Sequence, residues 1–153
     1  MATISRIGFG QVEPNHLSAQ RNGQIYAQLP AAVAIENGMF AKYDLAGGAV
    51  NLTGAGEWML AFSEVKVYDA RETAADFRIE AGQYPRLFKT SVGDIFTTNK
   101  VAGLDGITEA GATLKVGTDG ILVAGNDDNM EWKVVKVYTM PDGSKGVKVQ
   151  RVK

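Results

Sequence analysis

Glycine-punctuated runs of alternating polar and apolar residues are the feature that most constrains the fold of this chain. Glycine supplies 18 of its 153 residues, well above the usual share of about 7%. Because glycine adopts the positive φ angles that tight turns require, this excess predicts many turns between short segments. Several segments, such as Gln24–Leu29 and Val65–Tyr68, alternate with a period of two, which is typical of half-buried strands. The pattern predicts a mainly β protein.

Two hairpins are predicted in the last third of the chain. Residues 131–152 contain two valine-rich runs that flank Pro141–Gly146. Proline presets one turn dihedral there, and Asp-Gly supplies the left-handed position, so we expect an antiparallel hairpin. Residues 112–124 show the same organisation around the turn Gly117–Gly120.

Two further local predictions follow from the first half of the chain. Asn37-Gly38 is a strong hairpin signal, and it would join residues 31–36 to residues 39–43. The segment Ala70–Asp76 is the best helix candidate. Altogether, the density of turn signals predicts about eight to eleven short strands and at most one or two short helices.

The domain organisation follows from where this pattern begins. We expect residues 23–153 to form a single domain, a compact antiparallel β barrel or sandwich. Residues 1–22 are interpreted as an extended N-terminal arm, because glycine and proline interrupt their periodicity; the alternative is a first strand followed by a turn. Ile4, Ile7 and Phe9 are too few for a core of their own, so we expect them to bind a partner.

The residue types that carry most enzyme chemistry are scarce. The chain has no cysteine and one histidine, His16, so disulfides and thiolate metal sites are excluded. It contains no intact nucleotide or metal motif and no apolar run of membrane-spanning length. We therefore expect no catalytic centre, no cofactor and no membrane partner.

Three sets of polar residues are nevertheless candidate sites. The loop Asn126–Glu131 offers several oxygen ligands for a hard cation, although it lacks EF-hand spacing and also fits a solvated turn. Asp76 and Glu80 could act as acid and base, but in a β context they more naturally face water. A histidine such as His16 in a polar loop ordinarily has no catalytic role.

The last 21 residues have a basic bias. Trp132 and Tyr138 lie among these basic residues. The basic residues are Lys133, Lys136, Lys145, Lys148, Arg151 and Lys153. Such a mixture can bind single-stranded nucleic acid. Lysines also protect exposed strand edges, and a hairpin needs a polar face. With a formal net charge of -1, the chain has no global field that attracts polyanions, and nucleic acid is not the expected partner.

A short, cysteine-free chain rich in Gly, Ala, Thr and Val, with a polar opening and a stretch such as Tyr84–Asn99, resembles small structural proteins of tailed bacteriophage heads. The resemblance is to decoration, or cement, proteins, and head-fibre proteins fit nearly as well. It implies a structural virion protein that binds and reinforces the capsid lattice. Its partners would be the major capsid protein or copies of itself, and it would be made in the host cytoplasm and located in the virion.

Two other classes of function remain open from the sequence. One is a carbohydrate- or peptide-binding β-barrel module, which exposed aromatic side chains beside polar groups would favour. The aromatic residues to locate are Trp58, Tyr68, Trp132 and Tyr138. The other is an enzyme of unfamiliar type, which carboxylates converging in a deep pocket would favour.

Overall fold

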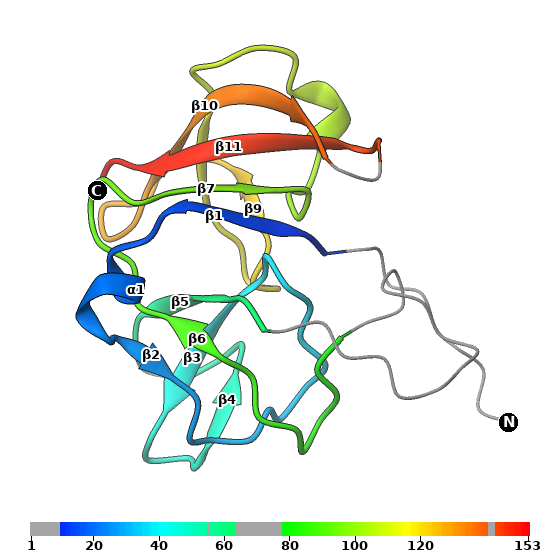
Figure 1. Ribbon diagram of the computed structural model, residues 1–153. Coiled ribbons are helices and arrows are strands. Elements are labelled where there is room, and N and C mark those ends of the chain that lie inside the picture. Colours follow the sequence, from blue (N-terminus) through cyan, green and yellow to red (C-terminus); the bar gives the residue numbers. More distant parts are fainter. Residues whose placement is uncertain (1–9, 55, 64–77, 141–142) are drawn as a thin grey trace, which may run out of the picture.

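The computed structural model describes residues 10–54, 56–63, 78–140 and 143–153. In this part of the chain, eleven strands form two antiparallel sheets, which confirms the prediction of a mainly β protein. Figure 1 shows the larger sheet above the smaller one. The arrangement is that of a sandwich, and the described strands do not close into a barrel.

The larger sheet contains both predicted C-terminal hairpins. Its six strands occur in the order β1 (Val12–His16), β7 (Ile95–Thr98), β11 (Lys145–Arg151), β10 (Trp132–Thr139), β8 (Thr113–Val116) and β9 (Leu122–Ala124). β10 pairs with β11, and β8 pairs with β9, both antiparallel. A short 3-10 helix, η2 (Leu104–Gly106), follows β7. Pro14 lies in the edge strand β1, where the register with β7 shifts between Glu13 and His16, a position that tolerates proline.

The smaller sheet is apolar on both of its faces. Its five strands occur in the order β2 (Ile25–Tyr26), β6 (Leu87–Phe88), β5 (Trp58–Ala61), β3 (Phe40–Asp44) and β4 (Ala49–Asn51). In β5, Trp58 and Leu60 contribute to the core shared with the larger sheet. Met59 and Ala61 contribute to a second core on the opposite face. Burial on both sides explains why this strand is a continuous apolar run.

An aromatic cluster lies at the centre of the shared core. Phe40 on β3 contacts Trp132 on β10, with ring centroids 5.7 Å apart. Phe96 on β7 completes the cluster, 5.1 Å from Trp132 in an edge-to-face arrangement. All three rings are fully buried. Because they come from both sheets, they join the two layers directly.

The hairpin predicted at Asn37-Gly38 is wrong. Residues 31–36 do not pair with β3; instead Ala31 forms a bridge with Val50, and Ile35 forms one with Ile79. This segment covers the second core of the smaller sheet. β3 pairs instead with β4, through the turn after Asp44, and with β5 on its other side. The local turn signal was correct, since Gly38 has a φ of 91°, but the chain after it enters a different layer.

Part of the expected N-terminal arm lies within the described residues and belongs to the larger sheet. β1 pairs with β7 from Val12 to His16. A short helix that the sequence did not predict, α1 (Ser18–Asn22), follows it, with Leu17 and Ala19 in the shared core. Residues 1–9, with Ile4, Ile7 and Phe9, lie outside the described residues, as does the expected helix at Ala70–Asp76.

Gly120 provides a test of how the two sheets are joined. It has a φ of 80° in the β8–β9 turn, and its carbonyl accepts the Phe40 amide at 2.6 Å. A Cβ at Gly120 would lie 2.3 Å from the Phe40 carbonyl oxygen. Gly111 also has a positive φ, but its Cβ would meet open space.

We expect Gly111→Ala to cost about 1–2 kcal/mol of unfolding free energy, the cost of a left-handed alanine. Gly120→Ala should cost at least about twice as much, because it also displaces the turn from β3. Urea titration followed by tryptophan fluorescence measures both variants. Equal losses would contradict the proposed docking of this turn.

Candidate functional site

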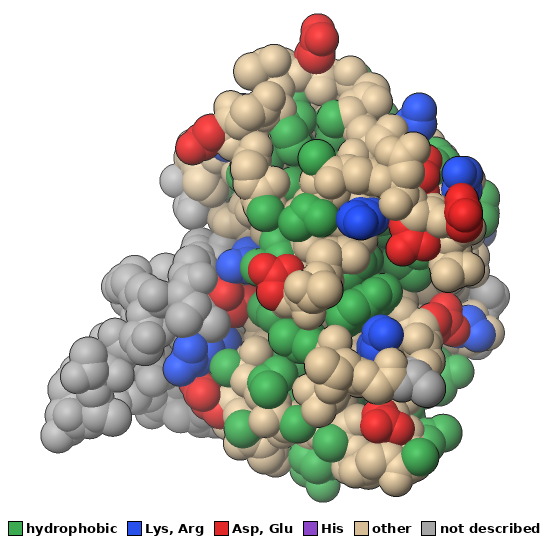
Figure 2. Space-filling model, turned by 180° about the vertical axis from the view of Figure 1, so that it is seen from behind, with side chains coloured by type: hydrophobic (Ala, Val, Ile, Leu, Met, Phe, Trp, Pro, Cys, Tyr) green, Lys and Arg blue, Asp and Glu red, His purple; other side chains and the backbone are tan. Residues whose placement is uncertain are grey.

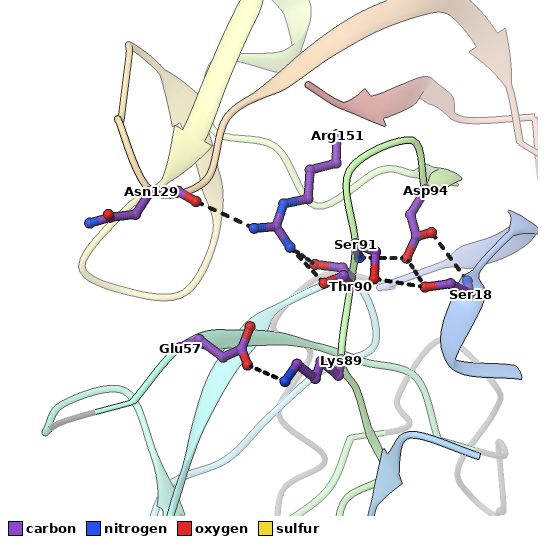
Figure 3. Close-up of polar contacts among 8 residues, drawn as sticks. All are labelled: Ser18, Glu57, Lys89, Thr90, Ser91, Asp94, Asn129 and Arg151. Atoms are coloured by element: carbon purple, nitrogen blue, oxygen red, sulfur yellow. Dashed lines mark hydrogen bonds and ion pairs between the residues drawn. The ribbon is translucent and has the colours of Figure 1, made fainter. Parts of the chain in front are cut away.

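Two chain crossovers between the sheets meet on one side of the molecule. The first runs from β1 through α1 to β2, and the second runs from β6 through residues 89–94 to β7. The Lys89 amide donates to the Gln24 carbonyl at 3.1 Å, which ties the two connections together. The polar side chains around this meeting point, which we call the crossover junction, are drawn in Figure 3.

Asp94 is the centre of the crossover junction. Its carboxylate is 2% exposed and accepts hydrogen bonds from the Ser18 amide at 3.2 Å, the Ser18 hydroxyl at 3.0 Å and the Ser91 amide at 3.0 Å. Leu17, at the N-terminal boundary of α1, has no capping side chain. Asp94, the residue just before β7, therefore provides the acceptor that a local capping residue would ordinarily supply.

Arg151, the last residue of β11, fixes the same crossover from the other side (Figure 3). Its Nη1 donates to the Thr90 carbonyl at 2.6 Å and to the Thr90 hydroxyl at 3.0 Å. Its Nη2 donates to the Asn129 carbonyl at 3.3 Å. A solvent-accessible ion pair between Lys89 and Glu57, at 3.3 Å, lies beside these contacts. The guanidinium thus links the end of β11 to the crossover at Thr90 and to the loop at Asn129.

The chemistry of the junction is that of a structural network. Ser18 and Ser91 hydroxyls lie 3.2 Å apart beside Asp94, a grouping that invites comparison with a nucleophile and its partner. The carboxylate, however, accepts two backbone amides as well as a hydroxyl. His16 is exposed, and it pairs with Ile95 in the β1–β7 ladder. Each polar group of the network therefore has a role in holding the crossovers.

A second buried polar cluster surrounds Glu36. Its carboxyl group is 3% exposed and contacts the Lys100 ammonium at 2.9 Å. Burial raises the pKa of Glu36, although Lys100 and the backbone amide of Gly10 oppose the rise. The adjacent Asn37 side chain exchanges two hydrogen bonds with the backbone of Ser63, at 2.7 and 2.9 Å. This cluster was not found in the sequence because its members come from separate segments.

In the loop Asn126–Glu131, two of the three acidic side chains accept hydrogen bonds from backbone amides of the loop itself. The Asp127 carboxylate accepts the Asn129 amide at 2.7 Å, and Glu131 accepts the Asp127 amide at 3.3 Å. Glu131 also lies 3.6 Å from the Lys153 ammonium. Among the described residues, no group of three or more His, Asp or Glu side chains is arranged to hold a metal ion.

The other sequence candidates do not form a common site. Asp76 and Tyr68 lie outside the described residues, and Glu80 forms an ion pair with Arg78. Trp132 is buried in the shared core. Trp58 is covered by the Lys42 ammonium, 4.7 Å from its ring centroid.

The C-terminal cations have different roles. Arg151 belongs to the crossover junction, and Lys153 contacts Glu131. The Lys145 ammonium donates to the Asp105 carbonyl at 3.4 Å. The remaining three share the outer face of the larger sheet, opposite the shared core: Lys133, Lys136 and Lys148. We call this surface, together with Val135 between the first two, the lysine face.

Comparison with known proteins identifies no relative. No family model matches the chain, and no curated protein or solved structure matches it. Within the part of the chain that the structure describes, no helix has the length and apolar character needed to cross a membrane.

The Asp94 network predicts a large stability loss on truncation. Asp94→Ala would remove a charged acceptor from the part-buried hydrogen bonds of the Ser18 and Ser91 amides, at about 2–4 kcal/mol in total. Asp119→Ala is the matched control, since Asp119 also accepts a backbone amide but in an exposed turn, and it should cost no more than about 1 kcal/mol. Urea titration of both variants measures the difference. Similar losses would show that the junction does not hold the crossovers.

The raised pKa of Glu36 predicts a pH dependence of stability. Because burial favours the neutral acid, its contribution is fully present below the ordinary pKa of 4.5 and is lost as pH rises through the raised pKa. Glu36→Gln lacks this titration. The unfolding free energy of the wild type, measured relative to this variant, should therefore decrease as pH rises from 4.5 towards neutrality. A flat or increasing difference would contradict the assignment.

Proposed function

We propose that this chain is a structural protein of a bacteriophage particle that binds and reinforces the capsid lattice, as a decoration or cement protein does. Its partners are the major capsid protein, further copies of itself, or both. The proposal begins from the resemblance of the chain to small phage head proteins. It locates the protein in the virion after synthesis in the host cytoplasm.

The observation that carries the proposal is the firm attachment of the chain just after its first nine residues. Gly10 is buried against Asn37, where a Cβ would lie 2.3 Å from the Asn37 carbonyl oxygen. The Gln11 amide donates to Asn99 at 2.8 Å, and β1 then enters the larger sheet. An apolar segment that starts from a fixed point loses less freedom on binding than one on a loose tether.

The junction and the buried clusters support the same proposal. A protein that reinforces a shell must transmit force between its contacts without rearranging. Asp94 and Arg151 fasten the crossovers, and the aromatic cluster fastens the two sheets. These features favour a rigid binding module.

The direct experiment is quantitative mass spectrometry of gradient-purified particles from cells that produce the protein. The copy number of a lattice-binding protein per particle should form a simple ratio with the copy number of the major capsid protein, as the symmetry of the shell requires. A protein that is absent from the particles, or present at one copy each, is not a decoration protein.

The first nine residues provide a second prediction. Replacing Ile4, Ile7 and Phe9 together with serine removes apolar groups worth about 1.5–3 kcal/mol each when buried. We expect binding to particles lacking the protein to weaken at least about tenfold, because each 1.4 kcal/mol is a factor of ten. The unfolding midpoint should stay within a few degrees of wild type.

The control for that variant changes polar neighbours in the same segment. Thr3, Ser5 and Arg6 are replaced together with alanine, and particle binding should be nearly unchanged. If the serine variant unfolds the domain, or if both variants bind as well as wild type, the first nine residues do not act as a binding arm.

A further inference from the structure

We propose that the lysine face of the larger sheet is a docking surface for an acidic protein surface, and that on the proposed function this surface belongs to the capsid shell. The proposal rests on the proposed function for the identity of the partner, but its chemistry comes from the sheet itself. It concerns Lys133, Lys136, Lys148 and Val135.

The first observation is an arrangement of charge that disfavours the isolated fold. Lys136 on β10 lies directly opposite Lys148 on β11. Like charges in directly opposed positions of an antiparallel pair are destabilising. Within the described residues, none of the three lysines of the face has an ion-pair or hydrogen-bond partner. Carboxylates from a partner would remove the repulsion and replace it with attraction.

The second observation is the irregularity that creates the face. The β10–β11 register shifts between Val134 and Lys136, so that Val135 is an extra residue on β10. Without it, strict alternation would direct Lys136 towards the core, since Val134 faces inward. The bulge instead directs Lys136 outward and leaves Val135 43% exposed. Bulges commonly re-aim side chains at functional surfaces.

The chemistry favours a protein partner over a nucleic acid. Val135 offers an exposed apolar contact, which a protein surface can bury and a phosphate backbone cannot use. Glu13 lies in the same row of the sheet as Lys148, because both pair with Thr97, so the acidic groups of a partner are expected over β10 and β11 rather than over β1. The nearby aromatic residue, Tyr138, donates its hydroxyl to Glu13 at 3.4 Å.

The lysine face lies on β10 and β11 of the larger sheet. β10, β11, β7 and β1 run side by side across the upper half of Figure 1. On the reverse side, shown in Figure 2, acidic and basic side chains are interspersed. Around the bulge, the three lysines carry charge of one sign, which the acidic groups of a partner would complement.

The most discriminating variant is Lys148→Glu. In the free protein it replaces a repulsive cross-strand pair with an attractive one, so the urea midpoint should rise. Binding to purified particles that lack the protein should nevertheless weaken at least about tenfold, since it sets like charges against the partner. A purely structural role for Lys148 would not move stability and binding in opposite directions.

A matched pair of multiple variants measures the whole face. K133E/K148E changes the formal charge by the same amount as R21E/R86E, which alters exposed arginines away from the lysine face. Only K133E/K148E should weaken co-sedimentation with particles. Binding of the wild type should weaken as ionic strength rises. Equal binding by wild type and K133E/K148E would overturn the proposal.

The failure of the proposed function is distinguishable from the failure of this inference. If wild-type protein does not bind particles, the proposed function is wrong, and the docking surface is then tested with defined probes. Fluorescence anisotropy with poly-L-glutamate should show binding at low salt that Lys148→Glu weakens. No binding, no effect of the variant, or tighter binding to an oligothymidylate than to polyglutamate would each overturn the acidic-protein assignment.

Discussion

The contact of Phe40, Phe96 and Trp132 across the two sheets is the interaction on which the rest of the structure depends. It brings β3 of the smaller sheet against β7 and β10 of the larger one. Once the layers are held together, the chain must cross between them, and buried backbone groups at the crossings need partners. Asp94 and Arg151 provide those partners. The polar network is therefore a consequence of the layered core.

The elements that depend on local turn residues and alternation were predicted correctly from the sequence. The two C-terminal hairpins form around their turns because proline and glycine fix the reversals, and the intervening valines alternate. The Asn37-Gly38 hairpin was wrong because a turn signal does not say which layer the chain enters next. The crossover junction could not be predicted, since Ser18 and Asp94 are 76 positions apart. Helix α1 was missed because Leu17, at its N-terminal boundary, is not a capping residue. Gly23, at its C-terminal boundary, was the one signal of a helix end.

The C-terminal lysines illustrate the same limit. Their number was visible in the sequence, yet their division among roles depends on register. Lys153 contacts Glu131 at the end of the hairpin, while Lys136 and Lys148 face each other because of one extra residue on β10. On the proposed function, this face and the first nine residues are two contacts on one rigid module. An apolar segment would supply affinity, and the lysines would supply orientation and specificity.

A cryo-electron microscopy map of purified particles tests this account most directly. It predicts copies of a two-layered β domain arranged with the symmetry of the shell. The outer face of β10 and β11 should lie against acidic side chains of the capsid protein. A map in which this domain is missing, or in which Lys136 and Lys148 face solvent while another surface makes the contact, would contradict the account.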